Sequence, residues 1–321
     1  MSTTPNLPQP PVPVEPERSW LGPWRLFAIV LTVAFAIAFF GTTSAQAAWQ
    51  EISKIIGLQG KPERVSANVL SEHEIEGLDQ MTSQAQAELL LERSINHYRG
   101  ANDQIAKRVG NWRGAVELNE RLNNLFMTAI NSDDLRVRAA AIEVAIAARN
   151  LDKSPATIDA LESDARSGDQ GARANALWDI GLLGNRGVEP QRAAEILLSS
   201  IHDENENVRY WAVEGLAYLA TDDVIAPLLD TFHNDPSATI RERAACSLAQ
   251  SGMLSEKQRR TAVPRLLDFA EDNSLDSQTH SWVFQALRDI TGQSLPHDAA
   301  AWRAWYNKGD TRWSPVTRDE Q

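Results

Sequence analysis

The 321-residue chain has a single cysteine, and this scarcity excludes two kinds of small domain. Without several cysteines, neither a disulfide scaffold nor a multi-cysteine zinc module can form. The chain also has no excess of positive charge, since its formal net charge is −12. Phosphate contacts require basic side chains, so the acidity argues against a general nucleic-acid binder.

Sequence signatures of catalysis are missing as well. The chain contains no G-x-S-x-G, H-E-x-x-H or G-x-G-x-x-G string. Gly60-Lys61 lies where a phosphate-binding loop would end, but Ile55 replaces the first glycine of that loop and Pro62 replaces its Ser or Thr. Alternating β-branched residues, which mark strands, are scarce. The sequence therefore predicts an all-α, non-enzymatic protein that holds no cofactor and no metal.

The N-terminal residues differ in composition from the rest. Residues 1–25 are rich in proline and are predicted to form a disordered or polyproline-like arm. Residues 26–47 carry no charge, and two interpretations of them stay open. Ala45-Gln46-Ala47 suits a signal peptide cleaved before Ala48. The uncharged run is also long enough for a single-pass membrane anchor. Both interpretations place the rest of the chain outside the cytoplasm.

The remaining chain contains a repeat of about 35 residues. An apolar residue followed by a basic one recurs, and the basic residues are Arg138, Arg173, Arg209, Arg241 and His280. Counted from each of them, positions +3, +4 and +7 are apolar and lie on one helical face. Three copies have a small residue at +11, near the expected helix end, where glycine suits a left-handed cap. These small residues are Gly184, Ala220 and Gly252.

Each of these helices is preceded by another segment of apolar periodicity. The preceding segments are 118–130, 158–165, 192–201, 224–232 and 262–270. Short polar loops join the two, and Asp203 and Asp235 in these loops suit turns and N-caps. The unit is thus a helical hairpin repeated about five times. One hairpin of this size cannot bury its apolar face alone, so the copies must stack.

The strings Asp203–Ala220 and Asp235–Gly252 follow the pattern D-x-x-x-x-V-R-x-x-A-x-x-x-L-x-x-L-G approximately. Pro227 and Pro264 stand before Leu-Leu in the first helix of two units. These features resemble HEAT repeats in the short form common in bacteria, over about residues 115–292. The resemblance implies an α-solenoid whose second helices line a concave surface.

Both ends of the repeat region look like helical caps. Thr291-Gly292-Gln293, followed by Asp298 and by Trp302 and Trp305, resembles the closing helix found after some bacterial HEAT arrays. At the other end, Ser71-x-x-Glu74 and Ser83-x-x-Gln86 are predicted capping boxes, with helices expected over 83–98 and 101–109. The predicted organisation is 1–25 arm, 26–47 signal peptide or membrane anchor, 48–114 helical extension or cap, 115–292 HEAT-like repeats, and 293–321 closing helix and tail.

Three other features are weak candidates for chemistry. Residues Asp203 to Glu214 match part of a calcium-binding loop, but Val208 replaces its essential glycine and the repeat pattern places this stretch on a helix. His202 and His233 occupy equivalent places one repeat apart, about 10 Å in a solenoid, which is too far to share a metal. Cys246 has no CxxC partner, and a packing role is expected for it.

Positions +2, +5 and +9 form a stripe beside the buried face of the second helices. Its candidate partner-binding residues are Trp178, Trp211, Glu214, Tyr218, Arg243 and Trp282. Aromatic residues and arginine are the types that dominate binding energy at interfaces. Two interpretations stay open: a binding face, or packing between repeats in which Tyr210 and Trp211 close a seam.

The leading functional hypothesis is a non-enzymatic scaffold of the bacterial cell envelope. It would be a monomeric solenoid that binds a protein or peptide on its concave face, with no nucleic-acid partner. The acidic body favours a partner with a basic or mixed surface. One alternative is an enzyme or enzyme subunit, since phycobilin lyases and a class of alkylpurine DNA glycosylases are related to HEAT proteins. Another is a structural envelope component that assembles end to end, which the predicted cap opposes.

Overall fold

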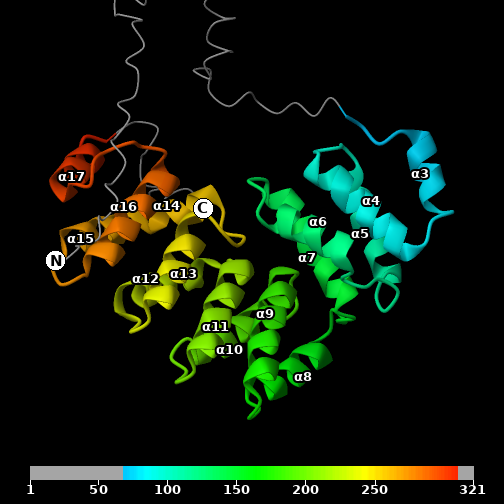
Figure 1. The fold of residues 1–321 in the computed structure, drawn as a ribbon, viewed down its shortest axis with the longest axis horizontal. Coiled ribbons are helices and arrows are strands. Elements are labelled where there is room, and N and C mark those ends of the chain that lie inside the picture. Colours follow the sequence, from blue (N-terminus) through cyan, green and yellow to red (C-terminus); the bar gives the residue numbers. More distant parts are fainter. Residues whose placement is uncertain (1–67, 310–321) are drawn as a thin grey trace, which may run out of the picture. The chain divides into compact units, whose positions relative to one another are not determined.

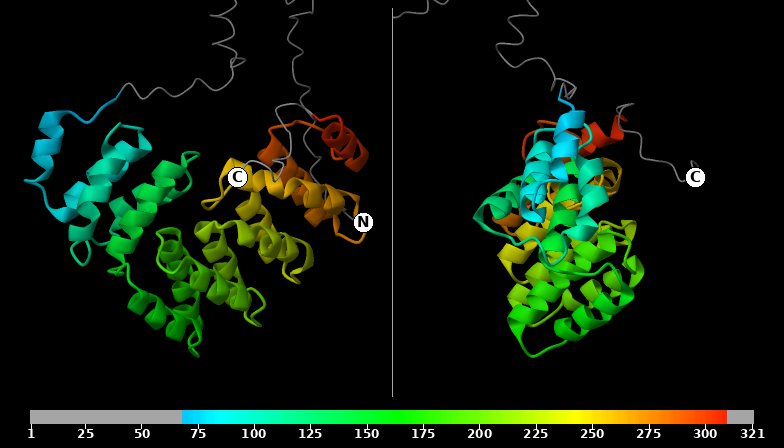
Figure 2. Two further views of the ribbon diagram at one scale, coloured as in Figure 1. Left: turned by 180° about the vertical axis from the view of Figure 1, so that it is seen from behind. Right: turned by 90° about the vertical axis from the view of Figure 1, so that its right-hand side faces the viewer.

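The computed structural model describes residues 68–309. The regular secondary structure in this range is helical, apart from one isolated bridge between Val69 and Arg99. In Figures 1 and 2 the helices follow one another in chain order, so most neighbours in sequence are neighbours in space. No helix within the described range is long and apolar enough to cross a membrane. The predicted arm and the predicted signal peptide or anchor (1–25 and 26–47) lie outside the described residues.

The helices before the repeats form a small bundle with the first hairpin. They are α3 (Glu72–Leu78), α4 (Ser83–Ile95), α5 (Ala101–Arg108), the 3-10 turn η1 (Val109–Asn111), α6 (Glu120–Ile130) and α7 (Leu135–Ala148). Helices α6 and α7 pack on α4, and α7 also packs on α5. We call α3–α7 the N-terminal bundle.

One of the two predicted capping boxes is confirmed and the other is wrong. Ser71 and Glu74 cap α3 reciprocally. Helix α4 begins at Ser83, as predicted, but its N-cap is Thr82 and not Ser83, because Thr82 is extended and its hydroxyl accepts the Ala85 N–H at 3.3 Å. Gln86 is therefore released from capping. Its side-chain oxygen accepts the indole N–H of the fully buried Trp112 at 2.9 Å.

The helices from α8 onward form a regular stack, which we call the C-terminal stack. It comprises α8 (Pro155–Ala165), α9 (Gln170–Asn185), α10 (Pro190–Ser200), α11 (Glu206–Leu219), the 3-10 turn η2 (Asp222–Val224), α12 (Ile225–Asn234), α13 (Ala238–Ala249), α14 (Glu256–Thr261), α15 (Val263–Glu271), α16 (Ser277–Thr291) and α17 (Ala299–Asn307). The predicted hairpins are all present, and α14 is an additional short helix. On α11 the core residues Ala212, Val213 and Leu216 are fully buried, and their equivalents in the other copies are buried too.

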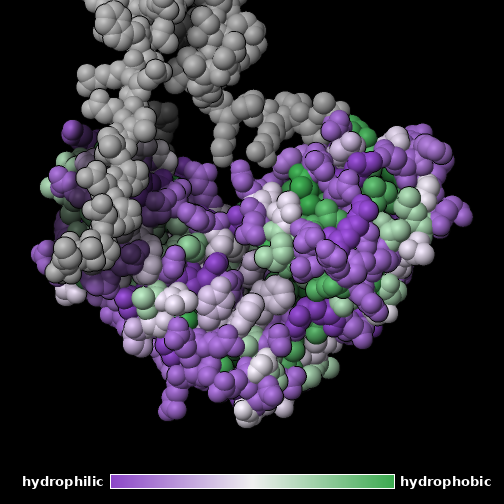
Figure 3. All heavy atoms as spheres, in the orientation of Figure 1, coloured by the Kyte–Doolittle hydropathy of each residue, from purple (hydrophilic) through white to green (hydrophobic). Residues whose placement is uncertain are grey.

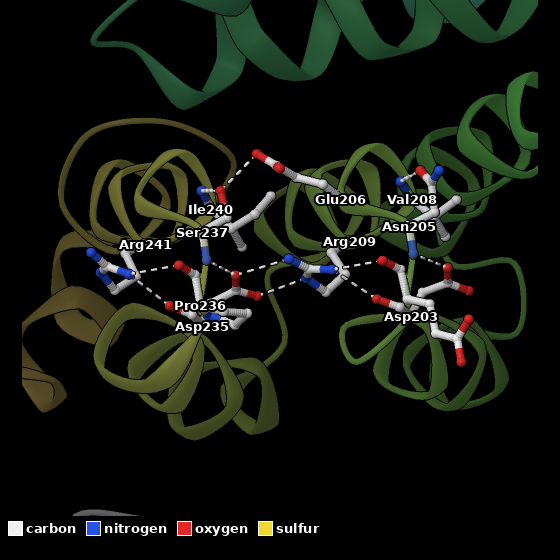
Figure 4. A network of polar contacts seen from close by, with 11 residues as sticks. Asp203, Asn205, Glu206, Val208, Arg209, Asp235, Pro236, Ser237, Ile240 and Arg241 are labelled. Atoms are coloured by element: carbon white, nitrogen blue, oxygen red, sulfur yellow. Dashed lines mark hydrogen bonds and ion pairs between the residues drawn. The ribbon is translucent and has the colours of Figure 1, made fainter.

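A ladder of arginine and aspartate side chains joins successive loops of the stack (Figure 4). Arg209 pairs with Asp235 of the next loop, Nε to Oδ2 at 2.9 Å, and donates to the Asp203 carbonyl at 2.9 Å. Arg241 repeats both contacts one hairpin later, with Asp276 and with the Asp235 carbonyl. This explains why a basic residue recurs at the repeat position.

The loop aspartates form turns but are not the N-caps. Asn205 and Ser237 cap α11 and α13, each accepting the N–H three residues later. Asp203 accepts the Asn205 N–H at 2.8 Å, and Asp235 accepts the Ser237 N–H at 2.8 Å. The aspartates therefore shape the loop while their remaining oxygens pair with the ladder arginines.

Helices α9 and α11 form the closest packing in the stack because glycines face each other there. A Cβ at Gly181 would lie 2.5 Å from the Gly215 carbonyl oxygen. Gly184 is also a packing residue, inside α9 and against Leu219, and not the predicted left-handed cap. The left-handed conformation occurs at Ala220 and Gly252 instead, with φ of 54° and 70°.

The stacking changes where the N-terminal bundle meets the C-terminal stack. Helix α7 approaches α9 much less extensively than α9 approaches α11. Arg138 occupies the ladder position of α7, yet no contact joins it to Asp169 of the next loop within residues 68–309. The solenoid therefore consists of two packed parts with an irregular junction between α7 and α9.

The last described helix packs on the end of the stack. Asp298 caps α17 by accepting the Ala300 N–H at 2.9 Å, as predicted. Trp302 is fully buried, and its indole N–H donates to the Pro296 carbonyl at 2.9 Å. Trp305 lies edge-on against Trp302 with ring centroids 5.8 Å apart. The helix thus covers apolar surface of the last hairpin.

Candidate functional site

The structure brings five of the six stripe residues together. Trp178 on α9 lies next to Trp211 and Tyr218 on α11, with ring centroids 5.9 and 6.4 Å apart. Glu214 on α11 pairs with Arg243 on α13, Oε1 to Nε at 2.9 Å. The sixth residue, Trp282 on α16, packs against the core separately, and no ring or polar contact joins it to the others in the described range.

Two further aromatic residues complete what we call the aromatic cluster. It consists of Phe126, Trp178, Tyr210, Trp211 and Tyr218. Phe126 on α6 meets Trp178 edge-on at 6.0 Å, so the cluster crosses the irregular junction. Edge-to-face pairs at these distances are favourable beyond simple burial. Phe126 and Tyr218 are buried, whereas the other three rings remain partly exposed.

The partial exposure bears on both interpretations of the stripe. Most of the ring surface packs between helices of successive repeats, which is the structural role considered above. Figure 3, in the orientation of Figure 1, shows an area of intermediate hydropathy in the middle of the molecule, with hydrophilic residues below it and hydrophobic residues to its right. Trp178 and Trp211, on the neighbouring helices α9 and α11, keep exposed ring surface with which a partner could make contact.

Two ion pairs flank the aromatic cluster. Burial raises the pKa of Glu214, and the charge of Arg243 and a hydrogen bond from Tyr210 oppose that rise. Burial also raises the pKa of Tyr218, to about 12. On the other side, Arg149 binds Asp179 and stacks over Trp178, its guanidinium carbon 5.3 Å from the ring centroid. The cluster is thus held between charges that are themselves largely paired.

Sequence reasoning missed Phe126, Arg149 and Asp179. Phe126 lies on a first helix, outside the stripe that was defined on second helices. Arg149 caps the end of α7 and Asp179 sits at +6 of α9, a position to which the repeat assigns no role. Asp179 directly follows Trp178 in sequence, and a charged residue at that place is the signal that could have indicated an ion pair beside the ring.

The weak candidates for chemistry are occupied in structural roles. Val208 and Glu214 lie on α11, so the calcium-like string does not form a loop around an ion. His233 bonds to Asp272 at 2.8 Å, and His202 is exposed in its loop. No group of three metal-ligating side chains occurs between residues 68 and 309. Cys246 is partly buried, and burial raises the pKa of its thiol.

A cavity of about 480 Å³ lies on the ladder edge between two successive loops. Its lining includes Asp203, Arg209, Asp230 and Asp235. Arg209 and Asp235 are already paired in the ladder, and Asp230 accepts a hydrogen bond from Asn234 at 2.7 Å. The cavity is therefore a recess between side chains that are engaged in structural contacts.

Comparison with known proteins identifies the repeats. Residues 158–249, from α8 to the end of α13, match the family model described as HEAT repeats. No curated protein matches the chain. One solved structure, entitled "Crystal Structure of Engineered Protein. Northeast Structural Genomics Consortium Target OR329", aligns with 64% of this chain and 89% of its own, at 15% identity and a TM-score of 0.32. Residues 158–249 of the C-terminal stack therefore match HEAT repeats, a class that generally mediates protein–protein interaction.

Proposed function

We propose that this protein is a non-enzymatic interaction scaffold that binds a protein or peptide along the second helices of its repeats. The observation that carries the proposal is the partial exposure of Trp178 and Trp211 side by side on α9 and α11. A stack of repeats offers an extended surface for such contacts. Tryptophan and arginine supply much of the binding energy at protein interfaces.

The partner that fits this surface has a basic or mixed surface of its own. The chain carries −12 in formal charge, and residues 1–47 contribute equal numbers of basic and acidic residues, so the acidity belongs to the rest. Complementary charge accelerates association and favours correct partners. We propose that the protein acts as a monomer and without a nucleic-acid partner.

The same proposal places the scaffold in the bacterial cell envelope. The uncharged residues 26–47 support export of the repeats, with the chain either retained as a single-pass membrane protein or released by cleavage before Ala48. Mass spectrometry of the native N-terminus distinguishes the two: an intact N-terminus supports the anchor, and a chain starting at Ala48 supports the soluble form.

The decisive experiment replaces the three partly exposed tryptophans of the stripe one at a time by alanine. We expect Trp178→Ala, Trp211→Ala and Trp282→Ala to reduce the amount of each partner recovered by crosslinking from native membranes. Trp305→Ala is the matched control, because it also removes a partly buried tryptophan but lies off the stripe on α17. If the three stripe variants lower thermal stability and retain every captured partner, the stripe is packing only and the proposal fails.

A further inference from the structure

Arg138 connects the N-terminal bundle to a distant loop of the C-terminal stack. Its guanidinium donates to the Gln250 carbonyl at 2.9 Å and to the Gly252 carbonyl at 2.5 Å, across more than one hundred residues of sequence. It also donates to the Ser132 carbonyl of its own loop. We call the contacts of Arg138 with Gln250 and Gly252 the Arg138 bridge. The other ladder arginines with printed contacts bind within their own and the next hairpin.

The loop that receives Arg138 is held in place independently of it. Arg259 donates to the carbonyls of Leu248, Ser251 and Leu254 at 2.8–3.0 Å. The Met253 backbone N–H donates to the Ala217 carbonyl of α11 at 2.8 Å. Gly252 lies so close to α11 that a Cβ would be 2.3 Å from the Ala217 carbonyl oxygen. Loss of Arg138 would therefore leave the loop in place and expose two carbonyls to water.

The bridge brings two buried guanidinium groups together. Arg138 and Arg259 are only 7% and 9% exposed, and the carboxylate whose charge favours the Arg138 cation is that of Asp133, in the loop before α7. Burial and, to a smaller extent, the positive charge of Arg138 together lower the pKa of Arg259 to about 10. The carbonyl dipoles of Gln250 and Gly252 favour the contact with Arg138, whereas repulsion between the Arg138 and Arg259 guanidinium groups opposes it. The stability of the Arg138 bridge therefore depends on the difference between this attraction and this repulsion.

The remaining seam between bundle and stack is small. Besides the bridge, it contains the Arg149–Asp179 and Arg186–Glu143 ion pairs and the edge-on pair of Phe126 and Trp178, and the apolar core continues across it. The helices α7 and α9 do not pack closely along their lengths. Relative motion is the usual behaviour of two packed parts unless their interface is both large and hydrophobic, and this one is not large. Residues 149–154 connect them, and Asn150 there has a φ of 56°.

We propose that the N-terminal bundle and the C-terminal stack open and close about residues 149–154, and that the Arg138 bridge holds the closed state. Opening separates Phe126 from Trp178 and exposes more of the Trp178 ring beside Trp211. The motion goes beyond the proposed scaffold function and does not depend on it. If the scaffold proposal is correct as well, the bridge regulates access to the surface at which the partner binds.

The test is a distance measurement between two spin labels in the full chain, without any partner. In a Cys246→Ser background, Asn123→Cys on α6 and Lys257→Cys on α14 supply exposed label sites on opposite sides of the seam. We expect one narrow distance distribution with Arg138 present. Arg138→Gln should shift the distribution to longer distances and broaden it, while far-UV circular dichroism keeps its helical signal.

The matched control is Arg241→Gln, which removes a ladder arginine whose contacts stay within the stack. It should leave the distance unchanged. An unchanged distribution in folded Arg138→Gln would overturn the proposal. If Arg138→Gln does not fold, the labelled protein that keeps Arg138 decides by itself: denaturant below its unfolding transition should populate a second, longer distance, and a single distance up to global unfolding rejects the opening motion. Partner capture plays no part in these outcomes, so the scaffold proposal is judged separately.

Discussion

The contact between α9 and α11 offers a sharp test of the packing, through Gly181→Ala. The new Cβ would lie 2.5 Å from the carbonyl oxygen and 2.6 Å from the Cα of Gly215, both backbone atoms that no side-chain rotation can remove. Because relaxed carbon contacts begin near 3.5 Å, the two helices must separate by about 1 Å.

The magnitude follows from two opposing terms. Overpacking of this kind costs about 1–3 kcal/mol. Alanine is favoured over glycine inside a helix by about 1 kcal/mol, which offsets part of that cost. Because the clashing atoms of Gly215 are backbone atoms, the upper part of the overpacking range, about 2–3 kcal/mol, applies. The net destabilisation of about 1–2 kcal/mol then corresponds to a fall in Tm of about 2–8 °C for a domain of this size. Since Trp178 and Trp211 lie on these two helices, tryptophan fluorescence should change in parallel.

The assay is thermal unfolding followed by circular dichroism, with Gly77→Ala as the matched control. Gly77 is also inside a helix, α3, and a Cβ there meets no atom within 4 Å. That substitution should not lower the Tm and should raise it slightly through helix propensity. If Gly181→Ala melts at or above the unsubstituted protein, the close approach of α9 and α11 is not what limits this position and the reasoning is refuted.

Three further predictions concern the ladder, the cluster and the cap. Asp235→Asn leaves the buried guanidinium of Arg209 without its charged partner and should cost about 3–5 kcal/mol in urea unfolding, whereas a loss near zero would show that the ladder is unimportant for stability. Tyr218 should ionise last among the tyrosines, near pH 12, in a titration of tyrosinate absorbance; Tyr218→Phe should remove that step, and a step that persists would place it on another tyrosine. Trp302→Ala should cost about 3–5 kcal/mol because a fully buried ring is lost, and hydrogen exchange should increase first in α17 and α16.

Burial of Glu214 predicts a specific dependence of stability on pH. Its pKa is raised in the folded state, so the folded protein binds more protons than the unfolded chain just above the ordinary glutamate pKa. Stability should therefore fall as pH rises through that window. Glu214→Gln should flatten this part of the profile of Tm against pH. A profile with the same slope in the variant would assign the effect to another carboxyl group.

The sequence was sufficient to predict the repeats, because the second helix of each hairpin must have one apolar face. Ala212, Val213 and Leu216 on α11 illustrate the pattern, which local spacing alone reveals. The N-caps were harder to predict, since Thr82 and Ser83 are both good capping residues. Thr82 is the cap because its backbone is extended, whereas Ser83 is already helical. Helix α14 was missed because six mostly polar residues show no periodicity.

The arrangement at the junction could not be predicted from local pattern. Arg138 and Arg209 occupy the same repeat position and each donates to the carbonyl six residues before it, yet their remaining partners differ. The choice depends on how α7 is oriented against α4 and α5, which residues far away in sequence determine. The same orientation brings Phe126 to Trp178, so that part of the candidate site was beyond a stripe defined on second helices.

The Arg138 bridge has a consequence for how this solenoid can change in length. A ladder tolerates the addition of whole hairpins, because each arginine finds the same partners in its new neighbour. A bridge from α7 to the loop after α13 spans a fixed number of hairpins. One extra hairpin between them would displace the loop by about one helix diameter, roughly 10 Å, and leave Arg138 without its two carbonyls. Helices outside this segment carry no such constraint, so duplication or loss of repeats is compatible with the bridge after the loop but not between α7 and the loop.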